Sequence, residues 1–292
     1  MRRLVGRRSA REAERCFVVE GAKVLGEALA AGVVVESVFF DAGAAGPDDA
    51  LRRLLDMVFA AGSRVYELEP GVLARVADTV TPQPVMAIVP QIDVALSALG
   101  DAGADFLVVC VDIRDPGSAG TVLRSAEAAG AAGVICCQGS VDIFNPKTVR
   151  ASAGAVFHVP VVLGGHPKEV LDRLGGWGLR RLGAAPRGGE EYSRADLAVP
   201  VALVLGNEAH GLPPEIDAAL DGTITIPMAG RAESLNVGMA AAILCFEAAR
   251  QRRAGTGLPD PVRAPSRPVP AEVAPMAARA GSPRADRAGG DG

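Results

Sequence analysis

The stretch FLVVCVDIRDPGSAGTVLRSAEAAGAAGVICC occupies residues 106–137 and decides the fold of the larger part of the chain. It begins with an almost continuous apolar run, which is typical of a strand covered on both faces of a sheet. A glycine-rich turn, a helical pattern over 121–130 and a second apolar strand at 133–137 follow. A strand, a helix and another strand in this order predict two parallel strands joined by a crossover helix.

The same alternation continues toward the C-terminus. Apolar strands are predicted at 155–162, 199–206 and 223–228, and a long helix follows at 234–253. Together with the first stretch, they predict an α/β domain with a mostly parallel sheet over residues 105–253. Ligands of such sheets bind where loops leave the carboxyl ends of the strands. The loops that follow these strands are therefore the candidates for a functional site.

Residues 1–91 predict a separate, smaller α/β unit. Its predicted elements are a strand and an amphipathic helix within 16–32, strands at 33–41, 63–69 and 84–91, and a helix over 48–61. Residues 92–104 carry weak signals and are predicted to be a linker. From 254 to 292, proline, alanine, glycine and arginine dominate and periodicity is lost, which predicts a disordered tail.

Charge is distributed unevenly along the 292 residues, whose net charge is −4. Residues 1–15 hold six arginines against two glutamates, and residues 251–292 hold seven arginines against four acidic residues. Basic ends can bind the phosphates of a nucleic acid, and Arg7 and Arg8 are candidate contacts in the first of them. The alternative is that both ends are solvated and disordered.

The five cysteines show no spacing that is typical of a metal site. Cys136 and Cys137 are adjacent on a predicted strand, so their side chains point to opposite faces and do not share a metal. We expect buried free thiols in a reducing compartment. The N-terminal residues contain no apolar run, and no stretch reaches the length that a bilayer requires. These features predict a soluble cytoplasmic protein with neither a metal nor a membrane partner.

The first candidate loop, at residues 115–124, combines glycines with polar residues. Gly117 and Gly120 allow a tight turn and a close approach of another backbone. Ser118 is a candidate cap for the following helix, which carries Arg124. The alternative is a plain glycine turn with a surface arginine.

Two further loops have an unusual composition. LGNEAHGLP at 205–213 places a carboxylate and two glycines at a strand end, ahead of a helix start marked by two prolines. This loop can also be an ordinary turn, and we interpret His210 as a polar neighbour rather than a catalyst. The third loop, 226–236, leads into the long helix, for which Ser234 is a candidate N-cap. Capping alone does not explain Asn236 inside the first turn.

Several common chemistries lack their signature in this sequence. The chain contains no G-x-x-x-x-G-K-[ST] phosphate loop, no H-E-x-x-H zinc motif and no G-x-S-x-G nucleophile elbow. The dinucleotide fingerprint G-x-G-x-x-G is missing as well, which disfavours a nicotinamide oxidoreductase and the common Rossmann-type methyltransferases. The residues alone therefore indicate an α/β domain with three candidate loops.

These three loops, in this order, resemble the three motifs of the SpoU/TrmH branch of the SPOUT RNA methyltransferases. The resemblance rests on DPGSAGTVLRSAEAAGA at 115–131, FNPKTVRASAGAVFHVPV at 144–161, LVLGNEAHGL at 203–212 and IPMAGRAESLNVGMAAAILCFEAAR at 226–250. It implies a SPOUT domain with a C-terminal trefoil knot and a homodimer whose active site lies near the dimer interface. It also implies S-adenosylmethionine as cofactor and a ribosomal-protein-like substrate-binding domain in residues 1–91.

The resemblance also implies roles for individual residues. The implied catalytic set is Arg124, Glu208, Ser234 and Asn236. The implied cofactor contacts are Gly206, Asn207, Ile226, Met228 and Leu235. Candidate contacts to RNA are Arg150, Ser118, Arg7 and Arg8, and for Arg150 a structural ion pair is the alternative. In one departure, Ser118 stands where the family's first motif usually carries asparagine, which has a longer reach and both a donor and an acceptor.

The implied reaction is methyl transfer to a ribose 2′-hydroxyl of structured RNA, with ribosomal RNA favoured over transfer RNA by the N-terminal extension. A hydroxyl is a poor nucleophile until its proton is drawn away. Because a guanidinium stays protonated, we expect Arg124 to orient the oxygen and stabilise its developing charge rather than act as a general base. The alternatives are a non-catalytic RNA-binding protein on the same fold and a methyltransferase that modifies an RNA base.

Overall fold

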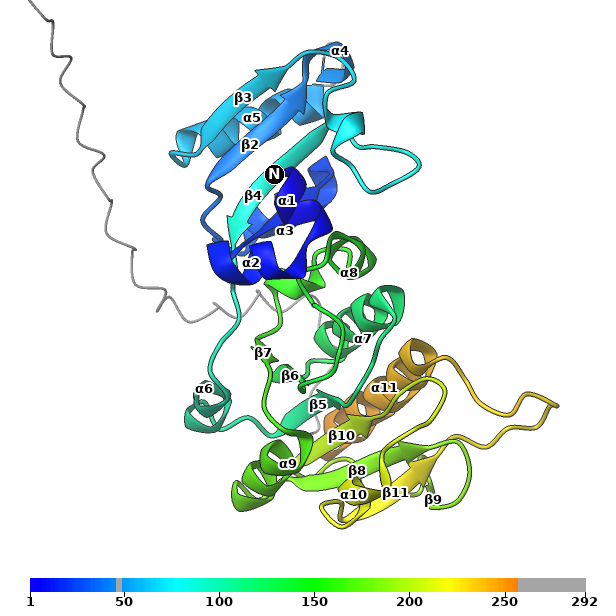
Figure 1. The fold of residues 1–292 in the computed structure, drawn as a ribbon. Helices are drawn as coiled ribbons and strands as arrows, with labels where there is room; N and C mark the ends of the chain where they lie inside the picture. Colours follow the sequence, from blue (N-terminus) through cyan, green and yellow to red (C-terminus); the bar gives the residue numbers. More distant parts are fainter. Residues whose placement is uncertain (46–48, 257–292) are drawn as a thin grey trace, which may run out of the picture.

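The computed structural model describes residues 1–45 and 49–256, which form two sheets with their covering helices (Figure 1). The smaller sheet has the strand order β1-β4-β2-β3. Its strands are β1 (Cys16–Glu20), β2 (Ser37–Asp41), β3 (Arg64–Leu68) and β4 (Val85–Pro90). Strand β4 is antiparallel to both its neighbours, whereas β2 and β3 are parallel. This is the small α/β unit that the alternating apolar pattern predicts.

Helices cover both faces of the smaller sheet. The helices of this part are α1 (Arg2–Gly6), α2 (Arg8–Glu14), α3 (Ala22–Ala30), α4 (Ala42–Ala45) and α5 (Asp49–Ala60), with a 3₁₀ turn η1 (Leu73–Arg75). Apolar residues of α3 and α5 pack on one face, and those of α1 and α2 pack on the other. The sequence predicts α3 and α5 but not α1 and α2. The alternative of a disordered basic lead is therefore wrong.

The larger sheet is wholly parallel, with the order β7-β6-β5-β10-β8-β11-β9. Its strands are β5 (Phe106–Cys110), β6 (Gly133–Cys136), β7 (Val161–Leu163), β8 (Arg180–Ala185), β9 (Glu190–Glu191), β10 (Val201–Leu205) and β11 (Gly222–Thr225). The strand pairing confirms the predicted mostly parallel sheet. Because Leu205 pairs with Cys110, β5 and β10 end level with each other. The loops that follow them therefore start side by side.

Helices cover the two faces of the larger sheet. The helices are α6 (Leu96–Asp101), α7 (Pro116–Ala128), α8 (Pro146–Ala151), α9 (Pro167–Gly176), α10 (Pro214–Asp217) and α11 (Val237–Thr256), with a 3₁₀ turn η2 (Ala155–Phe157). Helices α7 and α11 pack on one face, whereas α6, α9 and α10 pack on the other. Cys136 and Cys137 lie in the two different cores, as predicted for adjacent strand positions. Full burial of each valine or leucine of β5 and β10 contributes about 1.5–3 kcal/mol.

Several sequence expectations need correction. The strand predicted at 155–162 is a 3₁₀ turn followed by the short β7, because Pro160 lacks the amide that a strand ladder uses. The expected linker 92–104 contains α6, and α8, α9, β8 and β9 were not predicted. Helix α11 continues to Thr256, so the predicted tail cannot begin at 254. The rest of that tail, 257–292, lies outside the described residues.

The two sheets share a continuous apolar core. Phe17 of β1 lies with its ring centroid 4.7 Å from that of Phe144 and 6.2 Å from that of Phe157, and both partners belong to the larger unit. Around these rings, polar side chains pair across the same boundary: Arg11 with Asp142 at 2.6 Å, Arg150 with Glu20 at 2.6 Å and His158 with Glu27 at 2.9 Å. The smaller unit is therefore docked on the larger one. No helix among the described residues has the length and apolar character needed to span a bilayer.

Candidate active site

Helix α7 begins in the loop that follows β5. Asp115 caps it, since its carboxylate accepts hydrogen bonds from the backbone N–H of Ser118 at 2.6 Å and from the Ser118 hydroxyl at 2.9 Å. These bonds, the backbone one foremost, hold the pKa of Asp115 below its ordinary value. The prediction that Ser118 is the cap is therefore wrong. An aspartate three residues earlier satisfies the free amides, and Ser118 lies inside the helix.

The third loop is joined to the first by Asn236. Its side-chain Nδ2 donates to the Ser118 hydroxyl at 3.1 Å, and its Oδ1 accepts from the backbone N–H of Gly238 at 2.9 Å. Asn236 thus stands immediately before α11 and caps it, the place that the sequence analysis gave to Ser234. Ser118 is only 3% exposed and supports Asn236, and a contact of its side chain with RNA stays a prediction.

Two glycines allow α7 to pack closely on its neighbours. A Cβ added to Gly120 would lie 2.7 Å from the carbonyl oxygen of Thr148 in α8. A Cβ added to Gly238 of α11 would lie 2.8 Å from the Cβ of Thr121 in α7. No side chain fits at either place without a shift of the neighbour. The close approach predicted for Gly120 is confirmed, and α7 is fixed against both α8 and α11.

The second loop is a tight turn organised by Asn207. The backbones of Asn207 and Gly211 exchange two hydrogen bonds, at 3.0 and 2.9 Å. The Asn207 side-chain oxygen accepts from the backbone N–H groups of Ala209 at 2.9 Å and His210 at 3.2 Å. A Cβ on Gly206 would lie 2.5 Å from the carbonyl oxygen of Gly211. The turn therefore requires glycine at 206 and presents Glu208 at its exposed tip.

Asp112, which sequence reasoning missed, connects the first two loops. It has a backbone φ of 54°, which is unusual for a residue with a side chain. Its backbone carbonyl and its Oδ2 accept hydrogen bonds from Asn207 Nδ2 at 2.9 and 3.1 Å. Its Oδ1 accepts from Arg114 Nε at 2.9 Å, and the backbone N–H of Arg114 donates to Glu208 at 3.4 Å. A carboxylate directly after an otherwise apolar strand was the signal available in the sequence.

A cavity of about 680 Å³ opens between the second and third loops and the loop after β8. Every predicted cofactor residue lines it, together with two of the predicted catalytic residues. These are Gly206, Asn207, Ile226, Met228 and Leu235, with Glu208 and Ser234. The structure thus brings together residues that lie up to 29 positions apart in the sequence, from Gly206 to Leu235.

The cavity fits the chemistry of S-adenosylmethionine. Ile226, Leu212 and Leu235 provide apolar surface for a purine ring. The tight turns at Gly206 and Gly211 bring backbone amides and carbonyls to the wall without intervening side chains. The volume lies within the range of about 300–1,000 Å³ that is typical of small-molecule sites.

The loop after β8 is a further part of the cavity that the sequence analysis missed. Residues 184–189, which form the end of β8 and the loop after it, line the cavity and include Arg187 and two successive glycines with positive φ. A Cβ on Gly189 would lie 2.5 Å from the backbone oxygen of Thr223, so this loop lies directly against β11. The strand β8 that leads into it begins with two arginines and contains a glycine, so it lacks the continuous apolar pattern that identified β5 and β10. The Gly-Gly pair was the remaining signal.

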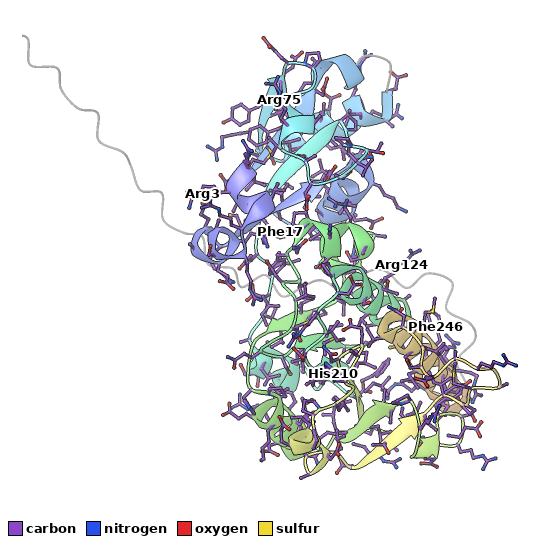
Figure 2. All side chains as sticks on the ribbon, turned by 45° about the vertical axis from the view of Figure 1, so that its right-hand side comes forward. Arg3, Phe17, Arg75, Arg124, His210 and Phe246 are labelled. Atoms are coloured by element: carbon purple, nitrogen blue, oxygen red, sulfur yellow. The ribbon has the colours of Figure 1, made fainter. Side chains whose placement is uncertain are left out.

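Arg124 lies apart from this cavity. It is exposed on α7, two turns after Pro116, and it is not among the lining residues. Figure 2 shows Arg124 at the surface and well separated from His210, which lines the cavity. Asn236 is not among the lining residues either, although its neighbours Ser234 and Leu235 are. A single copy of the chain thus presents the predicted catalytic set in two places.

The predicted RNA contacts of the basic residues have different surroundings. Arg7 is exposed between α1 and α2, and Arg8 is paired with Glu12 at 2.8 Å. Arg150 donates to the buried carboxylate of Glu20 at 2.6 Å, which is the structural ion pair named as the alternative. Arg150 therefore connects α8 to the smaller sheet. Contacts of Arg7 and Arg8 with RNA stay predictions.

The cysteines are free thiols, and their surroundings determine their protonation. Burial raises the pKa of Cys137 and of Cys245 to about 12, so these thiols stay protonated. All five cysteines are free, and four of them are buried, whereas Cys16 is half-buried. Within residues 1–45 and 49–256, no cluster of three or more histidine, cysteine, aspartate or glutamate residues is arranged to bind a metal.

The sequence model of the SpoU rRNA Methylase family matches residues 105–246, and that of the MRM3-like substrate binding domain matches residues 1–87. The chain is 33% identical to the 23S rRNA (guanosine(2553)-2′-O)-methyltransferase RlmP of Bacillus subtilis, over 79% of this chain and 87% of that protein. It is 31% identical to a 23S rRNA (uridine(2479)-2′-O)-methyltransferase of Streptomyces viridochromogenes, over 86% and 88%.

The fold agrees with these sequence similarities. The crystal structure of the SpoU methyltransferase AviRb from Streptomyces viridochromogenes in complex with the cofactor AdoMet superposes with a TM-score of 0.76. The two chains are 31% identical, and the superposition covers 86% of this chain and 96% of that one. The cavity, the three connected loops and these similarities lead to one assignment. The chain belongs to the SpoU family and is a SpoU/TrmH-type RNA 2′-O-ribose methyltransferase.

Proposed function

We propose that this protein transfers the methyl group of S-adenosylmethionine to a ribose 2′-hydroxyl of ribosomal RNA. One observation carries the proposal: the loops after the parallel strands β5, β10 and β11 are joined by hydrogen bonds beside one cavity, from Asn236 to Ser118 and from Asn207 to Asp112. The names of the relatives, which act on guanosine and uridine of 23S rRNA, support a ribosomal substrate. They also indicate that the fold does not by itself select the base.

The residues of the chain hold the two reactants. When bound, S-adenosylmethionine supplies an electrophilic sulfonium methyl. The backbone of the Gly206 turn and the apolar side chains Ile226 and Leu235 hold the donor in the cavity, which excludes water from its apolar part. Asn236 and Ser234 align the ribose hydroxyl, and Glu208 lies at the mouth, where it accepts hydrogen bonds. An arginine beside the hydroxyl oxygen stabilises the charge that develops as the proton leaves.

That arginine is Arg124, and we propose that it enters the site from a second copy of the chain. Arg124 is exposed on α7, outside the cavity of its own chain. Next to α7, helix α11 exposes Met239 by 60% and Phe246 by 49%, two turns apart on the helix. Such an apolar stripe favours burial against a partner. A homodimer that packs these helices together would cover the stripe and bring Arg124 to the partner's cavity.

Further parts of the proposal concern threading, recognition and location. The order of the motifs supports a trefoil knot in the C-terminal part of the larger domain. The match of residues 1–87 to a substrate binding domain supports RNA recognition by the smaller sheet, in a ribosomal-protein-like manner. We also propose a cytoplasmic location, which a ribosomal substrate supports.

The decisive assay uses purified protein, tritiated S-adenosylmethionine and an unmodified 23S rRNA transcript. Transfer of label to RNA, with one linkage made resistant to alkaline cleavage, is the expected result. Label recovered on a base by nuclease digestion and mass spectrometry would favour base methylation instead. Binding of RNA without transfer, and without heat of binding for S-adenosylmethionine in calorimetry, would favour the non-catalytic alternative.

The dimer proposal is tested with mixed dimers. Arg124→Ala and Asn236→Ala homodimers are each expected to lose roughly 10²–10³ in rate, the scale for one preorganised group. A heterodimer of the two variants, isolated by different tags, contains one complete site only if Arg124 acts in the partner's cavity. About half of the wild-type rate is then expected. An inactive heterodimer would show that Arg124 acts within its own chain.

A further inference from the structure

Arg114 lies between the first and second loops at the mouth of the cavity. Its backbone N–H donates to Glu208, which lines the cavity, and its Nε donates to Asp112 Oδ1 at 2.9 Å. The side chain is 73% exposed. Among the described residues, its two Nη groups have no hydrogen-bond partner. One edge of the guanidinium is thus fixed, and the other edge faces solvent.

Asp112, which fixes the side chain of Arg114, adopts an unfavourable backbone conformation. Asp112 adopts a φ of 54°, a conformation that costs on the order of 1 kcal/mol or more for a residue with a side chain. In this conformation its two carboxylate oxygens accept from two different loops, from Arg114 and from Asn207. An ordinary surface ion pair contributes little and needs no such conformation. The geometry instead holds the guanidinium in one orientation.

The negative charge of the loops around Arg114 indicates which kind of ligand its free Nη groups would bind. Three carboxylates, those of Asp112, Asp115 and Glu208, lie in the loops at this end of α7, and Glu208 lines the cavity. An RNA backbone approaching them meets like charge, which opposes binding. A guanidinium with two free Nη groups matches the paired oxygens of a phosphate. Its pKa is raised, chiefly by the hydrogen bond to Asp112, so it remains charged.

We propose that Arg114 binds a backbone phosphate of the RNA next to the target nucleotide, and that Asp112 acts as the positioning residue that holds the guanidinium. The proposal rests on the proposed function, because it requires RNA at this site. Since Arg114 adjoins Glu208, a phosphate bound there flanks the ribose in the cavity. Phosphate contacts fix the register of a nucleic acid without reading its sequence.

The test measures binding of an unmodified 23S rRNA transcript to the full chain, by fluorescence anisotropy over a range of salt concentrations. Arg114→Gln removes the charge and keeps a polar side chain. We expect affinity to fall roughly tenfold. The slope of log affinity against log salt should decrease in magnitude by about one. Arg114→Lys should keep the slope but bind more weakly, because it lacks the fork of the guanidinium.

The matched control is Arg173→Gln, an exposed arginine on α9, which packs on the opposite face of the larger sheet. It makes the same charge change and should leave affinity and slope unchanged. Calorimetry with S-adenosylmethionine should give wild-type affinity for Arg114→Gln. A weakened affinity for S-adenosylmethionine with an unchanged salt slope would overturn the proposal and assign Arg114 to the donor.

The role of Asp112 is tested by a double-mutant cycle in RNA binding. If Asp112 acts through Arg114, the losses of Asp112→Asn and Arg114→Gln are not additive. Additive losses would show that Asp112 acts only on the turn at Asn207. Wild-type RNA binding and methyl transfer, with an Arg114→Gln variant that matches it in affinity and slope, would reject the inference alone. A wild-type protein that binds no RNA would reject the proposed function as well.

Discussion

The hydroxyl of Ser118 connects the first loop to the third, and its removal gives the sharpest prediction. In wild type it donates to Asp115 at 2.9 Å and accepts from Asn236 at 3.1 Å, and the residue is 3% exposed. A hydrogen bond to a charged group contributes about 1.5–3 kcal/mol and a neutral one about 0.5–1.5 kcal/mol. The amide of Asn236 lies near solvent and can bind water, so the combined loss in Ser118→Ala should be about 2–3 kcal/mol.

A destabilisation of this size has two readouts. For a protein of this length, each kcal/mol lowers Tm by roughly 2–4 °C, so Ser118→Ala should unfold about 4–12 °C below wild type. Because Asn236 loses its side-chain hydrogen bond to α7, kcat should also fall, by roughly tenfold or more, with little change in the affinity for S-adenosylmethionine.

The matched control is Ser125→Ala, which removes a similarly buried hydroxyl of the same helix. It should leave kcat at the wild-type value and lower Tm by less than Ser118→Ala. Thermal unfolding and single-turnover methyl transfer are measured on both variants. If the two variants are indistinguishable in both assays, the hydrogen bonds of Ser118 do not hold Asn236 and the third loop in place, and the reasoning is wrong.

Three further changes have expected outcomes. Gly206→Ala places a Cβ against the backbone of its own turn, so calorimetry should show at least a tenfold weaker affinity for S-adenosylmethionine; an unaltered affinity would contradict the tight-turn argument. Arg11→Met leaves the carboxylate of Asp142, which is 11% exposed, without its ion pair and should destabilise by about 3 kcal/mol in denaturant unfolding, whereas the double variant with Asp142→Leu should recover much of this; an equal loss in both variants would contradict the assigned ion pair. The hydrogen bond from Arg181 lowers the pKa of Asp221 to about 2 from an ordinary value of 3.8. The stabilisation that this ion pair gives the folded state is therefore complete above pH 4 and disappears as the pH falls to 2. In Asp221→Asn the free energy of unfolding should depend less on pH over this window, and an unchanged dependence would refute the assignment.

The sequence alone predicted those parts of the molecule that local pattern determines. The apolar runs of β5 and β10 identify buried strands, and the glycines after them identify turns at the same edge of a parallel sheet. Every predicted cofactor residue lines one cavity because the loops after β10 and β11 leave the same edge of the parallel sheet on either side of β8. The predicted catalytic set came from the resemblance of the three ordered motifs to those of the SpoU/TrmH family, and composition alone did not predict it.

Contacts between distant segments were beyond such reasoning. Helices α1 and α2 are held by Arg11, whose partner Asp142 lies 131 residues away, so the sequence could not exclude the alternative of a disordered basic lead. The choice of Ser118 and Ser234 as caps failed because a neighbouring Asp115 or Asn236 can perform the same task, and only the fold decides between them. The separation of Arg124 from the cavity depends on how α7 packs, which no local pattern encodes.

The docking of the smaller sheet on the larger one has a consequence for target choice. Phe17 is packed among aromatic rings of the larger unit, and ion pairs surround that contact. If the smaller unit binds RNA as proposed, its binding surface is held at a fixed distance from the cavity. The target nucleotide would then be selected by its distance from a structural feature of the folded RNA, and substitutions at the docking surface would change which ribose is reached.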